Sequence, residues 1–180
     1  MKKDIIFLDT ETTNLTESIG VPLEYQPYII EICCIRTNWK ATKIKGRFQS
    51  YIRPPIPIPT FITKITGIDD YKVMDSPNFK EILPDLQQLF LGAYTMVAHN
   101  LSFDRSLIYF ELLRIAKECS FPWPPDHFCT VEQSMFLKGF RLKLNELYHL
   151  ATEKQSIQNA HSAEGDTLAL IDCYKFLKGL

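Results

Sequence analysis

The sequence predicts an α/β fold in which a central mixed β-sheet is flanked by helices. Strand-like and helix-like segments alternate along the chain, as expected when helices pack on the faces of a sheet. The apolar run Ile5–Leu8 has the continuous hydrophobicity of a central strand buried on both faces. The 180 residues, 46% of them hydrophobic, suffice for one domain that spans residues 1–180.

Three further segments are predicted to be strands. Tyr28–Thr37 is rich in Ile and Cys, and Phe48–Arg53 ends at a series of prolines, so these two should form a meander with the first strand. Tyr94–Ala98 should be a short strand. Phe121–Phe128 is rich in proline and aromatic residues, and we expect a loop there.

Four helices are expected after the meander, each with an apolar stripe and a residue able to cap its N-terminus. The candidate caps are Ser76 or Asp75, Asn100, Asn145 and Ser162. Pro84 should disturb the first of these helices. The second should run to about Cys119.

Charge and composition exclude several classes of protein. The net charge of −1 argues against a protein that coats nucleic acid through a strong overall positive field. No signal peptide and no run near the ~20 apolar residues of a membrane span is present, so we expect a cytoplasmic protein with no membrane contact. The five cysteines form no CxxC pair and are expected to be buried free thiols.

Two carboxylates stand where the first strand ends. Asp9 and Glu11 are two residues apart, and strand alternation points both side chains to the same side. Ligands in α/β sheets collect at the carboxyl ends of central strands. The pair therefore predicts a site, although a solvated strand end with a capping aspartate is an equal alternative for these two residues alone.

Two later segments place carboxylates at similar junctions. Asp104 should lie in the first turn of a helix, where the helix dipole favours a negative charge. His161 should precede the last helix, with Asp166 in its first turn. Taken separately, Asp104 could simply be a dipole partner, and the histidine and aspartate a surface pair. Together they strengthen the prediction of one site.

These segments resemble the three motifs of the DEDDh 3′→5′ exonucleases, a ribonuclease H-like family that includes the proofreading epsilon subunit of bacterial DNA polymerase III and ribonuclease T. Asp9–Thr12 resembles the first motif, His99–Asp104 the second and His161–Asp166 the third. Thr66–Ile68 resembles the family's intervening segment, but the epsilon-type pattern often has histidine where Thr66 stands. The Leu15–Gln26 insertion is unusual and could form a loop beside the site.

The resemblance implies a two-metal hydrolysis of phosphodiester bonds. Hard carboxylate oxygens favour Mg²⁺ or Mn²⁺ over Zn²⁺, and two such ions would assist the attacking water and the leaving 3′-oxygen. By resemblance, Asp9 bridges both ions, Glu11 and Asp166 hold one, and Asp104 supports the other. His161 would be the general base, because a histidine can accept a proton near neutral pH.

The expected substrate is a nucleic acid with a free 3′ end, with single-stranded DNA favoured over RNA, and the expected product is a nucleoside 5′-monophosphate. The resemblance also implies proofreading and a polymerase partner. Candidate substrate contacts are Thr10, Thr12, Ile65, Thr66, Asn100 and Phe103. Two alternatives stay open: a catalytically silent nucleic-acid-binding or polymerase-adaptor module on the same fold, and an exoribonuclease.

Overall fold

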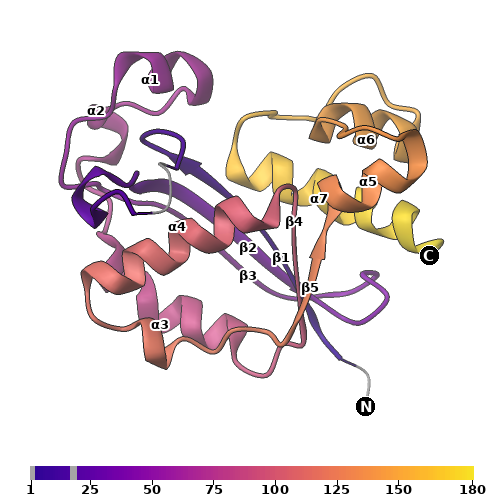
Figure 1. Cartoon of the computed structure of the whole chain (residues 1–180), viewed down its shortest axis with the longest axis horizontal. Coiled ribbons are helices and arrows are strands. Elements are labelled where there is room, and N and C mark those ends of the chain that lie inside the picture. Colours follow the sequence, from indigo (N-terminus) through magenta and orange to yellow (C-terminus); the bar gives the residue numbers. More distant parts are fainter. Residues whose placement is uncertain (1–2, 17–19) are drawn as a thin grey trace.

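A single mixed β-sheet organises the computed structural model of the protein, which describes residues 3–16 and 20–180. Within the described residues the strand order is β3-β2-β1-β4-β5 (Figure 1). The first three strands form the predicted antiparallel meander, and β4 and β5 run parallel to β1. The strands are β1 (Ile5–Thr12), β2 (Ile29–Thr37), β3 (Ile44–Tyr51), β4 (Thr95–Ala98) and β5 (Asp126–Cys129).

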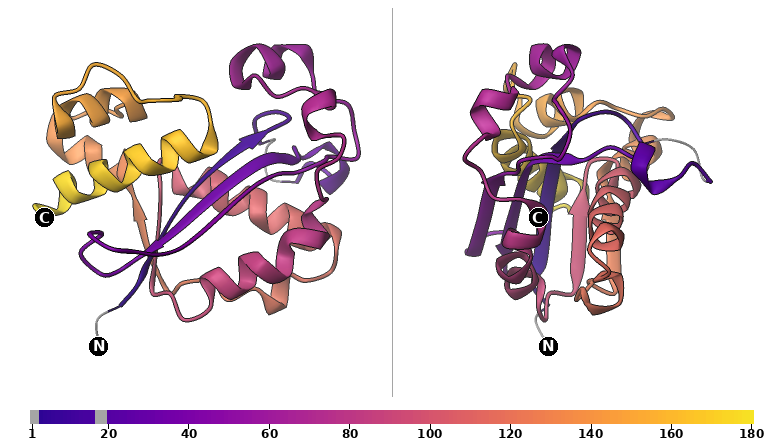
Figure 2. Two further views of the ribbon diagram at one scale, coloured as in Figure 1. Left: turned by 180° about the vertical axis from the view of Figure 1, so that it is seen from behind. Right: turned by 90° about the vertical axis from the view of Figure 1, so that its left-hand side faces the viewer.

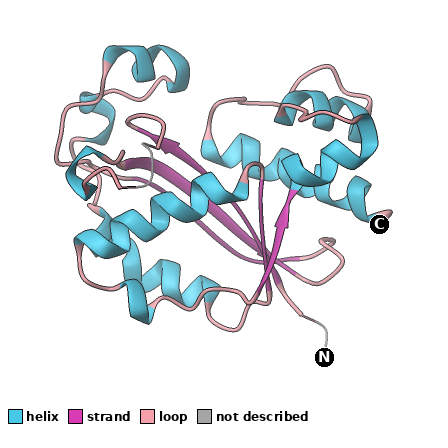
Figure 3. Ribbon diagram, viewed as in Figure 1, coloured by secondary structure: helices cyan, strands magenta, loops and turns pink. Residues whose placement is uncertain are grey.

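Helices cover both faces of the sheet, as predicted. Side chains of α3 and α4 share one buried cluster with the sheet, and those of α7 share another (Figures 2 and 3). The helices are α1 (Thr60–Thr66), α2 (Asp70–Val73), α3 (Phe79–Phe90), α4 (Leu101–Arg114), α5 (Thr130–Lys138), α6 (Leu144–Thr152) and α7 (Ala163–Lys178), with short 3₁₀ helices η1 (Leu23–Tyr25) and η2 (Glu118–Ser120).

Successive side chains of the central strand β1 point to opposite faces of the sheet. Ile6 and Leu8 pack in the cluster with α3 and α4, whereas Ile5 and Phe7 pack in the cluster with α7. The Phe7 ring meets Tyr174 of α7 edge-on, with 5.2 Å between ring centroids. This alternation decides which way every later side chain of β1 points.

The helices α1 and α2 were not predicted, because their sequences are short and follow the proline series. They form a lobe with its own small core at one end of the sheet (Figure 1). Pro59 occupies the N-cap of α1, and Gly67 ends that helix with a φ of 68°. Glycine adopts this left-handed conformation without steric cost.

Some predicted helix starts were wrong. Helix α3 begins after Asn78, whose side chain forms a capping box with Glu81, and not at Asp75 or Ser76. It also continues through Pro84. The packing of this helix against the sheet outweighs the single hydrogen bond that proline removes.

The other expected caps had mixed outcomes. Asn100 precedes α4 but has a φ of 76°, and its side chain makes no capping bond. Asn145 lies inside α6 and accepts a hydrogen bond from the Ile157 amide at 3.3 Å. Ser162 caps α7 as predicted by accepting from the Gly165 amide at 3.1 Å.

The segment expected to be a loop contains a strand at its end, β5, and α5 follows directly. Helix α4 ends at Arg114, before the expected limit of Cys119.

Cys119 is exposed, whereas the other four cysteines are buried as expected. The insertion at residues 15–26 contains η1, and its residues 17–19 lie outside the described residues. No helix in the described part of the chain is long and apolar enough to cross a membrane.

Candidate active site

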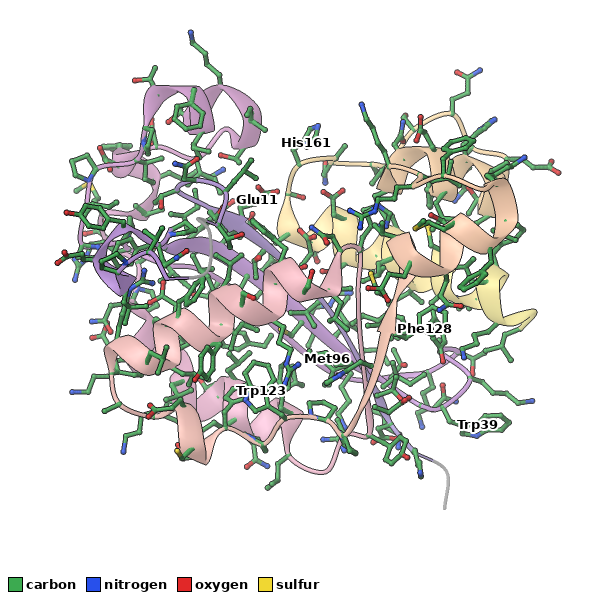
Figure 4. The ribbon with its side chains drawn as sticks, in the orientation of Figure 1. Glu11, Trp39, Met96, Trp123, Phe128 and His161 are labelled. Carbon is green, nitrogen blue, oxygen red and sulfur yellow. The ribbon has the colours of Figure 1, made fainter. Side chains whose placement is uncertain are left out.

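Three carboxylates meet at the carboxyl end of β1. Asp9 and Glu11 continue the alternation of Ile5 and Phe7, so both point to the α7 face, where Asp166 lies. One ligand oxygen from each of the three comes within 4.8 Å of the others. Figure 4 shows Glu11 at this end of the sheet, near the loop that leads into α7. The predicted convergence of these three residues is therefore present in the structure.

The first turn of α7 positions Asp166. Its backbone amide donates to the Ser162 carbonyl at 3.0 Å, and its carboxylate accepts from the backbone N–H of His161. Gly165 allows the preceding loop to lie against the helix, because a Cβ there would come within 2.4 Å of the Asn159 carbonyl oxygen. A side chain at this position would displace the loop that carries His161.

Asp104 approaches the same end of β1 from α4, on the opposite face. Its side chain is 2% exposed and accepts a hydrogen bond from the Thr10 hydroxyl at 2.8 Å. Thr10 points toward α4 because it alternates with Asp9 and Glu11. Asp104 lies close enough to Asp9 to raise its pKa.

Burial raises the pKa of all four carboxyls, and nearby negative charges add to the rise for Asp9, Glu11 and Asp166. Burial, and then the charges of Asp104 and Asp166, raise the pKa of Asp9 well above its ordinary range. Burial and the charge of Asp166 raise the pKa of Glu11 to about 8, and burial raises that of Asp104 to about 7. Burial also raises the pKa of Asp166, although His161 opposes the shift. These shifts have the direction expected for carboxyls that are buried close to like charges.

His161 lies at the rim of this cluster. It is exposed and has a backbone φ of 64°, a left-handed conformation that residues other than glycine adopt rarely. Figure 4 shows it on the loop before α7, at the solvent-facing side of the site. His161 lies close enough to Asp166 to lower the pKa of that carboxyl, so the predicted neighbourhood of these two residues is observed.

His99 connects three segments of the protein. Its Nδ1 lies 2.9 Å from the Thr130 hydroxyl of α5. Burial lowers its pKa to about 4, against a hydrogen bond with the Leu142 backbone that raises it. The half-buried neutral ring joins the end of β4 to α5 and to the segment before α6.

Sequence reasoning missed a fifth carboxylate, Glu31. It is 1% exposed and pairs directly with Glu11 across the antiparallel strands β1 and β2. A charged residue inside the apolar strand Ile29–Thr37 was a usable signal, because carboxylates are seldom fully buried without a purpose.

Three of the residues predicted to contact substrate use their hydroxyls in hydrogen bonds within the protein. The Thr10 and Thr12 side chains are buried; Thr10 binds Asp104, and Thr12 donates to the Asn14 carbonyl at 2.6 Å. The Thr66 hydroxyl donates to the Ile62 carbonyl at 3.0 Å near the end of α1. Short polar side chains often form such local hydrogen bonds with nearby groups.

The other three expected contacts differ in accessibility. Ile65 is 56% exposed on α1, and Asn100 is exposed before α4. Phe103 is only half-buried, but it packs against the core on the α3–α4 face. Ile65 and Asn100 are therefore the more accessible candidates.

Comparisons with known proteins agree on one family. A family model described as an exonuclease, RNase T, matches residues 6–174. Epsilon of DNA polymerase III from Buchnera aphidicola is 34% identical over 161 residues, which cover 87% of this chain and 65% of that protein. DNA polymerase III PolC-type from Caldanaerobacter subterraneus is 38% identical over 108 residues, 60% of this chain and 7% of that protein. The chain thus spans less than two thirds of these relatives.

Solved structures agree on the ribonuclease H-like fold. A structure of Exonuclease X in complex with 5′ overhanging duplex DNA has a TM-score of 0.68 and 22% identity, and the match covers 97% of this chain and 91% of the other. An E. coli ExoI–ssDNA complex has a TM-score of 0.76 and 19% identity, covering 99% of this chain and 41% of the other.

Proposed function

Because this chain belongs to the RNase T exonuclease family, we propose that it is a divalent-metal-dependent 3′→5′ exonuclease that releases nucleoside 5′-monophosphates. One observation carries the proposal: ligand oxygens of Asp9, Glu11 and Asp166 lie within 4.8 Å of one another at the carboxyl end of β1. Carboxylates brought so close in a partly buried place repel one another unless a cation joins them.

The donor set fits Mg²⁺ or Mn²⁺. All the donors are hard carboxylate oxygens, which these ions prefer, and no thiolate belongs to the group. Asp9, Glu11 and Asp166 would hold the metal, and Asp104 would support a second ion from the α4 side. When bound, such ions supply Lewis-acid polarisation of the scissile phosphate and neutralise developing charge.

The chain's own residues would orient the site and move the proton. His161 would accept a proton from the attacking water at the exposed rim of the cluster, where the ring is accessible to a substrate. Thr10 fixes the Asp104 carboxylate with its hydroxyl. The first turn of α7 holds Asp166 beside the loop that carries His161.

We infer a DNA end as the substrate. The proteins similar in sequence are named as DNA polymerase III subunits and as the 3′-5′ exonuclease DinG. A single-stranded or frayed 3′ end would contact the exposed residues Ile65 on α1 and Asn100 before α4. A polymerase partner and a proofreading role would follow from the same likeness to epsilon.

The proposed activity can be tested with a 3′-labelled DNA oligonucleotide. With Mg²⁺ the purified chain should release labelled mononucleotide, and EDTA should stop the release. The rate of release should then be compared on single-stranded DNA, single-stranded RNA and a DNA duplex with a mismatched 3′ end. Both DNA substrates should be degraded faster than RNA. Binding without release in Mg²⁺ and Mn²⁺ would favour a silent binding module, and faster release from RNA would favour an exoribonuclease.

Ile65 offers a test of where the terminal bases pack. Replacing its half-exposed side chain by alanine should raise KM for single-stranded DNA by ~5–10-fold, which corresponds to ~1–1.4 kcal/mol of lost apolar contact. The turnover number should hardly change, because Ile65 is on α1 and is not one of the clustered carboxylates. Steady-state kinetics of Ile65→Ala measure both constants.

Ile44→Ala is the matched control, because Ile44 is 48% exposed but lies on β3 at the end of the sheet opposite Glu11. Its KM should equal that of the wild type. An unaltered KM in Ile65→Ala would place the contact elsewhere.

A further inference from the structure

Glu31 is a buried carboxylate that the proposed reaction does not use. It sits in β2, directly opposite Glu11, and is 1% exposed. Its neighbours in β2 alternate between the two cores: Ile32 packs with α3 and α4, and Cys33 packs with α7. Glu31 therefore points to the α7 face, the same face as Asp9 and Glu11.

Both oxygens of Glu31 accept hydrogen bonds from neutral amides. Oε2 accepts from the backbone N–H of Ala163 at 3.2 Å, and Oε1 accepts from the side-chain amide of Gln49 on β3 at 3.2 Å. Ala163 is the first residue of α7. The first N–H groups of a helix have no partner within the helix, so Glu31 caps α7 from a strand that is 132 positions away in the sequence.

The contact with Ala163 fixes the turn that carries Asp166. Two further bonds hold the same part of α7 on the meander: Thr167 donates to the Cys33 carbonyl at 3.4 Å, and Arg47 of β3 pairs with Glu164. Glu31 differs from these because it both bonds to the helix and faces Glu11 across the paired strands. A shift of the first turn would move Asp166 relative to Asp9 and Glu11.

A carboxylate in this place carries an electrostatic cost. Its charge adds to the repulsion on Asp9, Glu11 and Asp166. No cation contributes to its two hydrogen bonds. A residue that increases this repulsion should have a compensating structural role. The hydrogen bond of Glu31 with Ala163 connects β2 to α7.

We propose that Glu31 is a positioning residue of the metal site, which holds the N-terminus of α7 so that Asp166 lies among the ligands Asp9 and Glu11. This inference rests on the proposed function, because the ligands are those of the proposed metal site. The role belongs to the hydrogen bond with Ala163 and not to the charge of Glu31.

Two conservative variants separate the hydrogen bond from the charge. Glu31→Gln removes the charge but keeps an oxygen that can accept from Ala163, while the Gln49 amide can turn to complete the pair. Glu31→Asp keeps the charge, but its side chain is shorter by one methylene group, which moves the carboxylate away from the Ala163 N–H. Glu31→Ala removes both.

The test is a calorimetric titration of each folded protein with Mn²⁺ alone, without nucleic acid. Glu31→Ala and Glu31→Asp should bind Mn²⁺ ~10–100-fold more weakly than the wild type, the range for residues that orient metal ligands. Glu31→Gln should lose less affinity than either. Glu111→Ala serves as the control, because Glu111 is another buried carboxylate that accepts from a β2 amide, that of Ile29 at 3.1 Å. It should lose stability without losing Mn²⁺ affinity.

The outcomes separate this inference from the proposed function. Wild-type affinity in Glu31→Asp, or weaker binding in Glu31→Gln than in Glu31→Asp, would overturn the positioning role while leaving the metal site intact. A wild-type chain that does not bind Mn²⁺ would overturn both. If Glu31→Ala does not fold, the Gln and Asp variants decide the question alone.

Discussion

Replacing His161 by alanine should lower the turnover number on single-stranded DNA by ~10²–10⁴-fold, the usual contribution of a general base. His161 is exposed, so its loss leaves no buried cavity. The affinities for Mn²⁺ and for the oligonucleotide should stay close to those of the wild type, because the carboxylates remain in place. Single-turnover kinetics with titrations of both ligands give the three quantities.

His127→Ala is the control for this experiment, since His127 is also exposed but lies on β5. It should keep the full rate. Unchanged turnover in His161→Ala would remove His161 from the proposed reaction. A parallel loss of Mn²⁺ binding would instead assign it to the metal site.

Divalent ions should raise the melting temperature strongly, and the size of the effect should depend on pH. Burial and the charge of Asp166 raise the pKa of Glu11 in the folded protein from 4.5 to about 8. Asp9 and Asp104 are shifted in the same direction. The free energy of unfolding of the metal-free protein should therefore fall as the pH rises between these values.

Metal reverses this loss by binding the folded form. At a concentration of ~100 times its dissociation constant, each ion adds ~2.7 kcal/mol to the free energy of unfolding. Melting scans of the wild type at pH 8 should show a large upward shift with Mg²⁺ or Mn²⁺. No shift at millimolar concentrations would contradict a metal site of the proposed strength.

Asp9→Ala should lose this stabilisation by divalent ions. Without metal its melting temperature at pH 8 should equal or exceed that of the wild type, because one repelling carboxylate is gone, and divalent ions should add little. Asp4→Ala provides the contrast. Burial raises the pKa of Asp4, but its bonds to Lys45 and Arg36 lower it overall, so this variant should melt at a lower temperature while keeping the metal response.

The alternation of side chains along β1 made the carboxylate pair of the site predictable. An apolar run followed by Asp9 and Glu11 implies that both point to one face, and the Ser162 cap places Asp166 in the first turn of α7. These are local rules, so they could be applied without knowing the rest of the fold.

The contacts of the site with distant strands were less predictable. The sequence does not say that Thr10 meets Asp104, or that Glu31 meets Ala163, because both bonds depend on how helices dock on the sheet.

Local signals also failed where tertiary packing decides. Pro84 does not break α3, whose apolar face is held in the core. The strand Asp126–Cys129 follows a run of prolines and aromatics, and it becomes a strand because β4 offers it a parallel partner. Propensity gives no information about such a partner.

If the carboxylate cluster degrades nucleic acid from its 3′ end with the help of divalent metal, the reaction can be followed on 5′-labelled single-stranded DNA. The substrate is sampled over time in Mn²⁺ with the wild type, Asp9→Asn and the control Asp4→Asn. The wild type and Asp4→Asn should give a ladder that shortens from the 3′ end, and Asp9→Asn should leave the DNA intact. A ladder of equal rate in Asp9→Asn, or immediate release of the 5′ label by the wild type, would contradict the claim.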